Sequence, residues 1–444
     1  MNPVGTLFME QLPTNMRGGA AHWQVRKQMR ASIDVAIIGA GPYGLTLAHG
    51  LAERGVEFRI FGKPLAAWKA NMPPGMLLKS YPWASNLYAG RAGFTVKEFC
   101  GRRALPYHDT MIALSRETFV AYCEEFQSRL VPWVEPRMLQ SLTRLQSGFR
   151  AELDDGQIVE ARRVVIAVGI QCFRHVPDVL SDLPEELCSH SGRYGSLGGL
   201  AGKDVTIIGA GSSATDLAAL LAQEGSSVCL VARTDKVAFA GTPRRRGWFE
   251  RLVSPSSGIG EGWVLTMCAA APELVRLLPE AHRLKLAYTP ALGPLGGAFM
   301  RDRVVGKVRI KAGFHVSEAA PSGSKVQLRL CRRDGTSEVV QTDHVIAATG
   351  YKTDVRRLSF LDRRIRSDLR VVNGAPMLSA DYESSVPGLH FIGPISANSF
   401  GPVSRFVFGT KHPSRSLPRY LEKSLRLTSS GILDAAVLSP VAPQ

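Results

Sequence analysis

The chain has 444 residues, of which 45% are hydrophobic and 21% charged, and a formal net charge of +16. This length suits two or three domains rather than a single core, and no apolar run approaches the roughly 20 residues that a membrane span needs. The basic residues are spread along the chain and form no nucleic-acid-binding motif, so we expect neither a nucleic acid nor a membrane as a partner.

Residues 1–32 are predicted to form a loose N-terminal arm, because they contain basic residues but no apolar stretch followed by a small-residue cleavage site. The seven cysteines of the chain include no CxxC and no close pair. Zinc sites and redox-active dithiols need near neighbours, so we expect neither, and no metal. Reduced thiols fit a cytoplasmic protein.

Strand and helix patterns then follow one another twice along the chain. From Ile33 come an apolar strand, a glycine-rich turn, a helix over 45–54 and the strand "VEFRIFG"; later, two strands flank a turn at Asp155–Gly156 and a buried strand ends at Gly169. The same order restarts at Asp204 and includes a second turn at Asp334–Gly335. The predicted fold is therefore α/β, with two doubly wound Rossmann-like units, the second inserted into the first.

The first glycine motif runs from Gly39 to Gly44 and includes Gly41, Pro42 and Tyr43. Its first glycine suits a tight turn from strand to helix, its second lets the backbone approach a pyrophosphate, and its third lets helix and strand pack closely. A purely structural turn is the alternative. The apolar strand before the motif and the apolar helix after it favour a dinucleotide site.

The strand that follows this first helix ends at Phe61, Gly62 and Lys63. An NAD site would carry an acidic residue here to bind the ribose. Its absence weakens an assignment to NAD and is tolerable for FAD, whose ribose would be held by the backbone or by Lys63.

The second motif contains Gly209, Gly211, Ser212 and Ser213, followed by an alanine that is still small enough for close packing. The next strand ends at Arg233 and Thr234, with arginine where an NAD site would have Asp or Glu. A guanidinium fits a 2′-phosphate bidentately. NADPH is therefore favoured over NADH, a solvated arginine being the alternative.

Two further segments complete a family pattern. "HSGRY" begins at His190, just before the second unit, and "ATGY" ends with Thr349, Gly350 and Tyr351. Over roughly residues 33–412 the chain resembles the class B flavin monooxygenases, which comprise flavin-containing, N-hydroxylating and Baeyer–Villiger enzymes. "HSGRY" matches only half of the flavin-containing signature and departs from the Baeyer–Villiger one, so the subclass stays open. For His190, a capping or packing role is the alternative, and we assign it no catalytic role.

The resemblance implies an FAD-binding domain in two parts, 33–170 and 343–444, and an NADPH-binding domain at 171–342. It also implies flavin contacts from the loop after the first unit and from the segment after the last strand, where Gly393-Pro394 replaces the usual Gly-Asp. The cofactor-binding residues expected in all are Gly39, Gly41, Pro42, Tyr43, Gly44, Phe61, Gly62, Lys63, Trp68, Lys79, Ser80, Gly209, Gly211, Ser212, Ser213, Arg233, Thr234, Thr349, Gly350, Tyr351, Gly393, Pro394, Phe400 and Gly401.

The implied activity is that of an FAD- and NADPH-dependent monooxygenase, which passes one oxygen atom from O2 to a small amine, sulfur compound or ketone through a C4a-(hydro)peroxyflavin. No acid–base pair is required, and we assign no catalytic residue. A flavin-dependent NADPH oxidase or reductase without oxygen transfer is the main alternative. A disulfide reductase would need a cysteine pair, and a non-catalytic flavoprotein would hold inert FAD or none. Residues 235–310 depart most from the repeated pattern and are expected to shape the substrate entrance.

Overall fold

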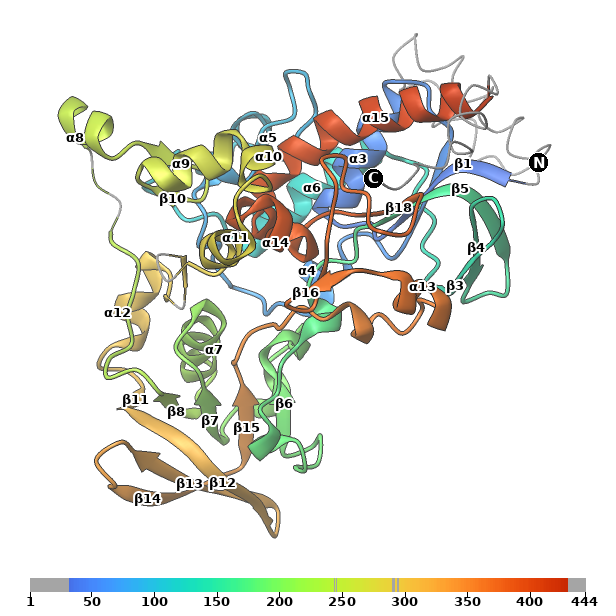
Figure 1. Ribbon diagram of the computed structural model, residues 1–444. Coiled ribbons are helices and arrows are strands. Elements are labelled where there is room, and N and C mark those ends of the chain that lie inside the picture. Colours follow the sequence, from blue (N-terminus) through green and yellow to red (C-terminus); the bar gives the residue numbers. More distant parts are fainter. Residues whose placement is uncertain (1–31, 243, 245, 290–291, 294, 430–444) are drawn as a thin grey trace, which may run out of the picture.

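The computed structural model describes residues 32–429, except 243, 245, 290, 291 and 294. The predicted arm at 1–32 thus lies outside the described residues, apart from its last residue. Figure 1 shows two sheets at opposite ends of the molecule, the first under a layer of helices and the second beside a smaller antiparallel sheet.

The first sheet has a parallel centre and an antiparallel margin. Strand β1 lies between β2 and β5 and is parallel to both. The first half of β5 pairs antiparallel with β4, which in turn pairs with β3, and the last three residues of β5 pair with β18. The strands are β1 (Ser32–Ile38), β2 (Phe58–Phe61), β3 (Leu139–Arg144), β4 (Phe149–Leu153), β5 (Ile158–Ile166) and β18 (Leu389–Phe391). The sequence predicted two separate strands here, the second strand of the hairpin after Asp155–Gly156 and a buried strand ending at Gly169. In the structure they are one continuous strand, β5.

The second sheet is wholly parallel, in the order β11-β8-β7-β15-β6. Its strands are β6 (Cys188–His190), β7 (Asp204–Ile208), β8 (Ser227–Ala232), β11 (Arg309–Ala312) and β15 (His344–Ala347). A three-stranded meander packs beside it: β12 (Phe314–Ser322), β13 (Lys325–Arg332) and β14 (Ser337–Thr342). The α/β class with two Rossmann-like parallel sheets is thus confirmed. In sequence, the whole second sheet falls between β5 and β18 of the first.

One helix follows the first strand of each sheet. Helix α3 (Pro42–Ala52) begins with proline, which suits a first turn because that position needs no hydrogen-bonded N–H. It starts three residues before the predicted helix. Helix α7 (Ser212–Gln223) holds the same place in the second unit. Both run from the carboxyl end of a parallel strand, where α/β folds bind nucleotides.

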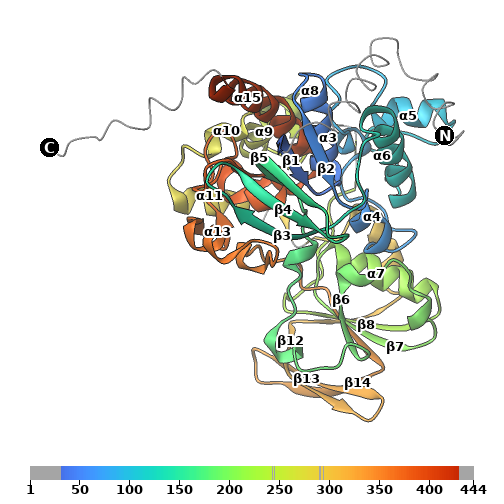
Figure 2. The ribbon, with the colours of Figure 1, turned by 90° about the vertical axis from the view of Figure 1, so that its right-hand side faces the viewer.

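The other helices of the first unit are α4 (Ala66–Ala70), α5 (Val96–Arg102), α6 (Arg116–Leu130), α13 (Arg363–Asp368), α14 (Ala397–Phe400) and α15 (Lys411–Ser429). Helix α15 packs along α3, and Gly50 makes this contact possible, since a Cβ there would lie 2.8 Å from the Ser414 carbonyl. The C-terminal helix thereby covers the helix of the first glycine motif, as both views show (Figures 1 and 2).

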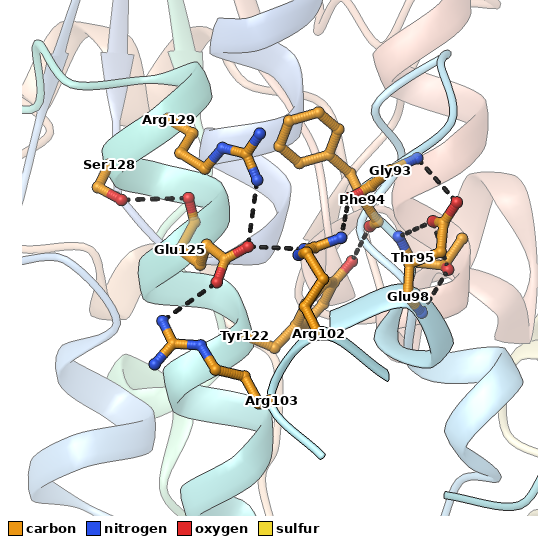
Figure 3. A network of polar contacts seen from close by, with 10 residues as sticks. All are labelled: Gly93, Phe94, Thr95, Glu98, Arg102, Arg103, Tyr122, Glu125, Ser128 and Arg129. Atoms are coloured by element: carbon orange, nitrogen blue, oxygen red, sulfur yellow. Dashed lines mark hydrogen bonds and ion pairs between the residues drawn. The ribbon is translucent and has the colours of Figure 1, made fainter. Parts of the chain in front are cut away.

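A polar network joins α5 to α6 (Figure 3). Thr95 and Glu98 form a capping box at the start of α5. Glu125 of α6 accepts hydrogen bonds from Arg102 at 2.6 Å and from Arg103 and Arg129 at 3.3 Å. The Tyr122 hydroxyl of α6 accepts from the Leu87 N–H and donates to the Phe94 carbonyl, each at 2.8 Å, so α6 holds both ends of the loop that follows the 3-10 helix η1 (Pro82–Ser85).

A helical segment leaves the second sheet after β8 and returns at β11. Its elements are α8 (Trp248–Val253), β9 (Ser256–Ser257), β10 (Gly260–Glu261), α9 (Trp263–Ala270), α10 (Pro272–Val275), α11 (Glu280–Ala287) and α12 (Arg301–Val304). It packs on the C-terminal part of the first unit, where Leu265, Cys268 and Val275 share a small core with Val403. The chain thus links both units a second time, beyond the strand crossovers.

Candidate cofactor and substrate site

The first glycine motif has the geometry of a phosphate cradle. Gly39 has a φ of +117°, and a Cβ on it would lie 2.4 Å from the Ala167 carbonyl oxygen; one on Gly44 would lie 1.9 Å from the Gly39 carbonyl oxygen. Gly41 differs, because a Cβ there would meet no atom within 4 Å. Gly41 is the N-cap residue of α3, and no side chain caps the N–H groups of the first helical turn. The first and third glycines are thus required by packing, and the second leaves space before the helix N-terminus for an anion.

Tyr43 ties this turn to the end of the chain. Its hydroxyl lies 2.9 Å from both the Ser404 and the Phe406 carbonyl oxygens, to which it donates. Its ring lies 3.4 Å from where a Cβ of Gly393 would stand. Burial raises the pKa of Tyr43 well above its ordinary value, so the hydroxyl keeps its proton. The predicted residues around 39–44 and around 393–401 therefore meet in space.

At the end of β2, backbone groups are hydrogen-bonded within the protein and one side chain is exposed. The Phe61 carbonyl accepts from the Gly39 N–H at 2.8 Å, and its ring is buried. The Gly62 N–H donates to the Glu135 carbonyl, and Lys63 is exposed. The Glu135 carboxylate forms an ion pair with Arg59 at 2.6 Å. Of the predicted ribose contacts, the Lys63 side chain is thus the one exposed to the site.

The second glycine motif repeats the first in detail. Gly209 has a φ of +142°, and a Cβ there would lie 2.3 Å from the Ala348 carbonyl oxygen. Gly211 precedes α7 in the same extended conformation in which Gly41 precedes α3, with φ values of −87° and −89°. Ser212 donates to the Leu295 carbonyl at 2.9 Å, whereas Ser213 is exposed at the helix N-terminus. The second glycine therefore has the same backbone conformation in both cradles.

Arg233 lies exposed just after β8, at the edge where α7 begins, and has no ion-pair partner among the described residues. Thr234 is turned away: its hydroxyl donates to the Lys236 carbonyl and its own carbonyl accepts from Gly313. Arg233 is thus a free cation beside an open cradle, the arrangement that a 2′-phosphate requires.

The predicted flavin loop lies between the two units. The Leu78 N–H donates to the Leu114 carbonyl and holds the strand that carries Lys79 and Ser80. Trp68 of α4 packs on Phe119, with 4.5 Å between ring centroids, and is half-buried. Its ring is therefore largely used in packing.

A charged cluster that the sequence patterns did not indicate surrounds Lys79. Asp216 of α7 is 5% exposed, and its burial raises the pKa of the carboxyl to about 7, against the opposing charges of Arg303 and Lys79. Partial burial, together with the nearby Arg405, lowers the pKa of Lys79. These residues come from the first unit, the second unit and the C-terminal segment. The sequence feature that could have indicated this cluster is Asp216, an acidic residue within the apolar stretch "TDLAALLA".

The two crossovers between the units run side by side. The His175 N–H donates to the Gly350 carbonyl, Lys352 donates to that of Phe173, and Thr349 donates its hydroxyl to the His175 carbonyl. The ring of Tyr351 lies edge-on to His190, 5.1 Å between centroids. The side chains of Thr349 and Tyr351 are thus engaged in the crossover, and Gly350 contributes its backbone.

His190 has a structural role at this crossover. Its Nδ1 accepts from the Gly192 N–H, and its Nε2 donates to the Gly350 carbonyl, each at 2.9 Å. Burial lowers its pKa, which keeps the ring neutral. The capping role left open from the sequence is the one observed.

The segment after β18 follows the expected order, with one exception. Gly393 precedes a 3-10 turn that begins at Pro394, and Gly401 lies against Val275 of α10. Phe400 is fully buried and stacks on Tyr382 at 3.9 Å, so its ring belongs to the core.

A cavity of about 510 Å³ opens between the helical segment and the C-terminal helix. One wall comes from α9 and α10, the other from α15, and Trp83 and Phe408 form an aromatic side. Lys411, Arg415 and Arg419 line it from one stripe of α15, four residues apart. Glu273 pairs with His412 across the cavity at 2.9 Å. The sequence had placed the substrate entrance in 235–310, and residues 256–273 contribute to this cavity; its cationic wall from α15 was not anticipated.

Both cradles fit a dinucleotide, and the described residues contain no group of three potential metal ligands. All seven cysteines lie within the described part of the chain and are free thiols. No helix among the described residues has the length and apolarity to cross a bilayer.

Known proteins share this plan. The family described as pyridine nucleotide-disulphide oxidoreductase matches residues 36–246. The indole-3-pyruvate monooxygenase YUCCA1 of Oryza sativa subsp. japonica is 26% identical over 339 residues, which cover 72% of this chain and 77% of the relative.

Two solved structures show the same fold. The ornithine hydroxylase PvdA of Pseudomonas aeruginosa has a TM-score of 0.70 at 16% identity and covers 89% of this chain and 100% of its own. The ornithine N-hydroxylase KtzI of Kutzneria sp. 744, solved with reduced FAD, NADP+ and L-ornithine, has a TM-score of 0.70 at 17% identity, with the same coverage of 89% and 100%. The family match, the relatives and the fold confirm the resemblance drawn from the motifs: the chain is similar to the class B flavin-dependent monooxygenases and is an oxidoreductase.

Proposed function

We propose that the chain is an FAD- and NADPH-dependent monooxygenase that transfers one oxygen atom from O2 to a small organic substrate. The observation that carries this proposal is the pair of matching glycine turns: Gly39 and Gly209 are closed by packing, and Gly41 and Gly211 precede the two helices in the same extended conformation. In this assignment residues 33–170 and 343–444 bind FAD, and residues 171–342 bind NADPH.

FAD fits the first cradle. The N-terminus of α3 faces its pyrophosphate across Gly41, the backbone at Gly62 and the side chain of Lys63 bind the adenosine end, and Gly393 and Pro394 supply backbone groups where relatives carry an aspartate. When bound, FAD supplies the redox and oxygen chemistry. The protein contributes orientation and the exclusion of water.

NADPH fits the second cradle. Its pyrophosphate meets the N-terminus of α7 at Gly211 and Ser213, and Arg233 binds the 2′-phosphate. An exposed, unpaired guanidinium is available for this contact, whereas an acidic residue at the same strand end would repel the phosphate.

Charged side chains that are partly or fully buried lie between the two units. Lys79, Asp216 and Arg405 meet there, and the raised pKa of Asp216, about 7, lets its carboxyl hold a proton near neutral pH. A protonated Asp216 lowers the cost of closing the two units over the cofactors, because no unpaired carboxylate is then buried. We assign these residues a positioning role.

The substrate is a small molecule that reaches the junction past the helical segment 235–310. Amines, sulfides and ketones are all candidates: the solved relatives named above are ornithine hydroxylases, and the plant relative is named for indole-3-pyruvate. The cavity lined by Trp83 and Arg415 supports an entrance on this side.

The experiment is to supply purified, FAD-loaded enzyme with NADPH, isotopically labelled O2 and a panel of amines, sulfides and 2-oxo acids or other ketones. Oxygen uptake and product mass are measured together. A product carrying one labelled oxygen atom, with NADPH and O2 consumed equally, supports the proposal. Stoichiometric hydrogen peroxide with every substrate identifies instead an NADPH oxidase. Gly211→Val serves as the control, because it blocks the second cradle and should abolish NADPH consumption.

A further inference from the structure

Half of the large hydrophobic side chains that are exposed among the described residues lie in one short stretch of the helical segment. They are Trp248, Phe249, Leu252, Val253, Trp263, Val264, Met267, Leu274, Leu277 and Leu278. Trp248 is 79% exposed and Leu277 68%. A concentration of exposed apolar side chains of this kind marks a binding surface. We call these ten residues the apolar face.

The spacing of the apolar face follows the helices. In α8, positions 248, 249, 252 and 253 lie on one side of the helix; in α9, positions 263, 264 and 267 point outward while Leu265 and Cys268 point into the core. In α9, the inward side therefore packs in the core, and the apolar residues on the outward sides of α8 and α9 are not needed for that packing.

Cations border the apolar face. Arg251 of α8 is exposed and has no ion-pair partner among the described residues. Lys411, Arg415 and Arg419 line the cavity whose other wall is α9 and α10, and among the described residues they too have no ion-pair partner. Of the nearby carboxylates, Glu250 is paired with Arg244 and Glu261 with Arg246, whereas Glu273 lies 2.9 Å from a His412 ring whose pKa is lowered by burial, and Glu280 is exposed. The four cations without an ion-pair partner outnumber Glu273 and Glu280, so the border is positive overall.

These parts share one end of the molecule. In Figures 1 and 2, α8, α9, α10 and α15 lie at the end opposite the β12–β14 meander. Exposed tryptophan, phenylalanine and leucine on short helices, bordered by lysine and arginine, are the composition of a helix surface that lies in a lipid interface. No spanning helix is needed for such binding.

We propose that the apolar face docks on an anionic lipid surface, with α8–α10 entering the headgroup layer and the cations of α15 binding the headgroups. Charge complementarity selects this occupant, because a second copy of a chain with net charge +16 would bring a like-charged border against this one. The proposal differs from the expectation of no membrane partner, which rested on the lack of a spanning segment and on the spread of basic residues along the chain, and it is independent of the reaction that the enzyme catalyses.

The test uses the full chain with its flavin bound and measures flotation with vesicles of phosphatidylcholine alone or mixed with phosphatidylglycerol. We expect binding to the mixed vesicles, weakened by salt. The double variant Trp248→Ser, Phe249→Ser should weaken it at least about tenfold. The double variant Arg415→Glu, Arg419→Glu should weaken it by at least about 25-fold, because each lost cation accounts for about fivefold and each new carboxylate is repelled by the headgroups.

Matched controls come from the far end of the molecule. Val339→Ser removes an exposed apolar residue of β14, and Arg333→Glu reverses an exposed charge in the turn before it. Both should bind as the parent does, and circular dichroism with flavin content shows that all variants are folded. Equal flotation with and without phosphatidylglycerol, or equal binding by all variants, would overturn the proposal. The proposal would also be overturned if the parent protein does not bind vesicles but forms a dimer, and the double variant Trp248→Ser, Phe249→Ser is a monomer.

Discussion

Arg233 is the single side chain on which the choice of nicotinamide coenzyme depends. It is exposed at the end of β8, the strand that follows the helix capped by Gly211, and no carboxylate among the described residues neutralises it. A charge-assisted hydrogen bond to the 2′-phosphate would therefore be formed only with NADPH.

We expect Arg233→Ala to lower kcat/KM for NADPH about 10- to 150-fold and to leave that for NADH nearly unchanged, since one hydrogen bond to a charged group contributes about 1.5–3 kcal/mol. Rates of flavin reduction with each coenzyme measure the effect. Arg333→Ala, at an exposed position of the β12–β14 meander, is the control and should change neither rate. A parent enzyme that uses both coenzymes equally would refute the assignment.

At the scale of elements, the glycines of the two strand–turn–helix units are of two kinds, those that the fold requires and those that it does not. Gly44 and Gly209 are required by the backbone, because a Cβ would lie 1.9 Å and 2.3 Å from a carbonyl oxygen. Gly41 is not required by the fold, because nothing lies within 4 Å of a Cβ there, and Gly211 precedes α7 in the same extended conformation. Substitutions at the two kinds should therefore fail in different ways.

Gly41→Val is expected to give folded protein that purifies without FAD, and Gly211→Val folded, yellow protein that NADPH does not reduce. Gly44→Ala is expected to lower the free energy of unfolding by several kcal/mol, because backbone atoms cannot yield to the new methyl group. Absorbance spectra and thermal unfolding distinguish these outcomes. Retention of FAD by Gly41→Val would show that the first cradle does not bind the pyrophosphate.

At the scale of the whole molecule, Asp216 makes the packing of the two units depend on pH. Its pKa is about 7 in the folded chain and close to the ordinary value of 3.8 when unfolded. The folded state thus holds a proton that the unfolded state has lost. The stabilisation from this carboxyl is complete below about pH 4 and is lost as the pH rises to about 7.

We therefore expect Asp216→Asn to be more stable than the parent above pH 7, by up to about 4 kcal/mol, with the difference vanishing towards pH 4. Denaturant unfolding across this pH range measures it. Asp178→Asn, at an exposed position, should show no such trend. An Asp216→Asn variant that is less stable than the parent near neutral pH, with the deficit vanishing as the pH falls, would mean that Asp216 is stabilised as a carboxylate, by Lys79 and Arg303.

The amino-acid sequence alone determined the local units: the two glycine turns, the strands that enter them, the helices that leave them and the free arginine after β8. Each depends on neighbours in sequence, since apolar periodicity and the backbone freedom of glycine act within one strand–turn–helix unit. The continuity of β5 was missed for a related reason, because a hairpin strand exposed in its first half and buried in its second resembles two strands.

The tertiary structure decided which side chains face the site. Phe400 is stacked in the core, and Thr349 and Tyr351 are bound to the neighbouring crossover, although their motifs suggested cofactor contact. Lys79 and Asp216 meet at the junction from positions far apart in sequence. The cationic wall of the cavity depends in the same way on how α15 packs against α3. Such meetings follow from the packing of whole elements, which no local pattern specifies.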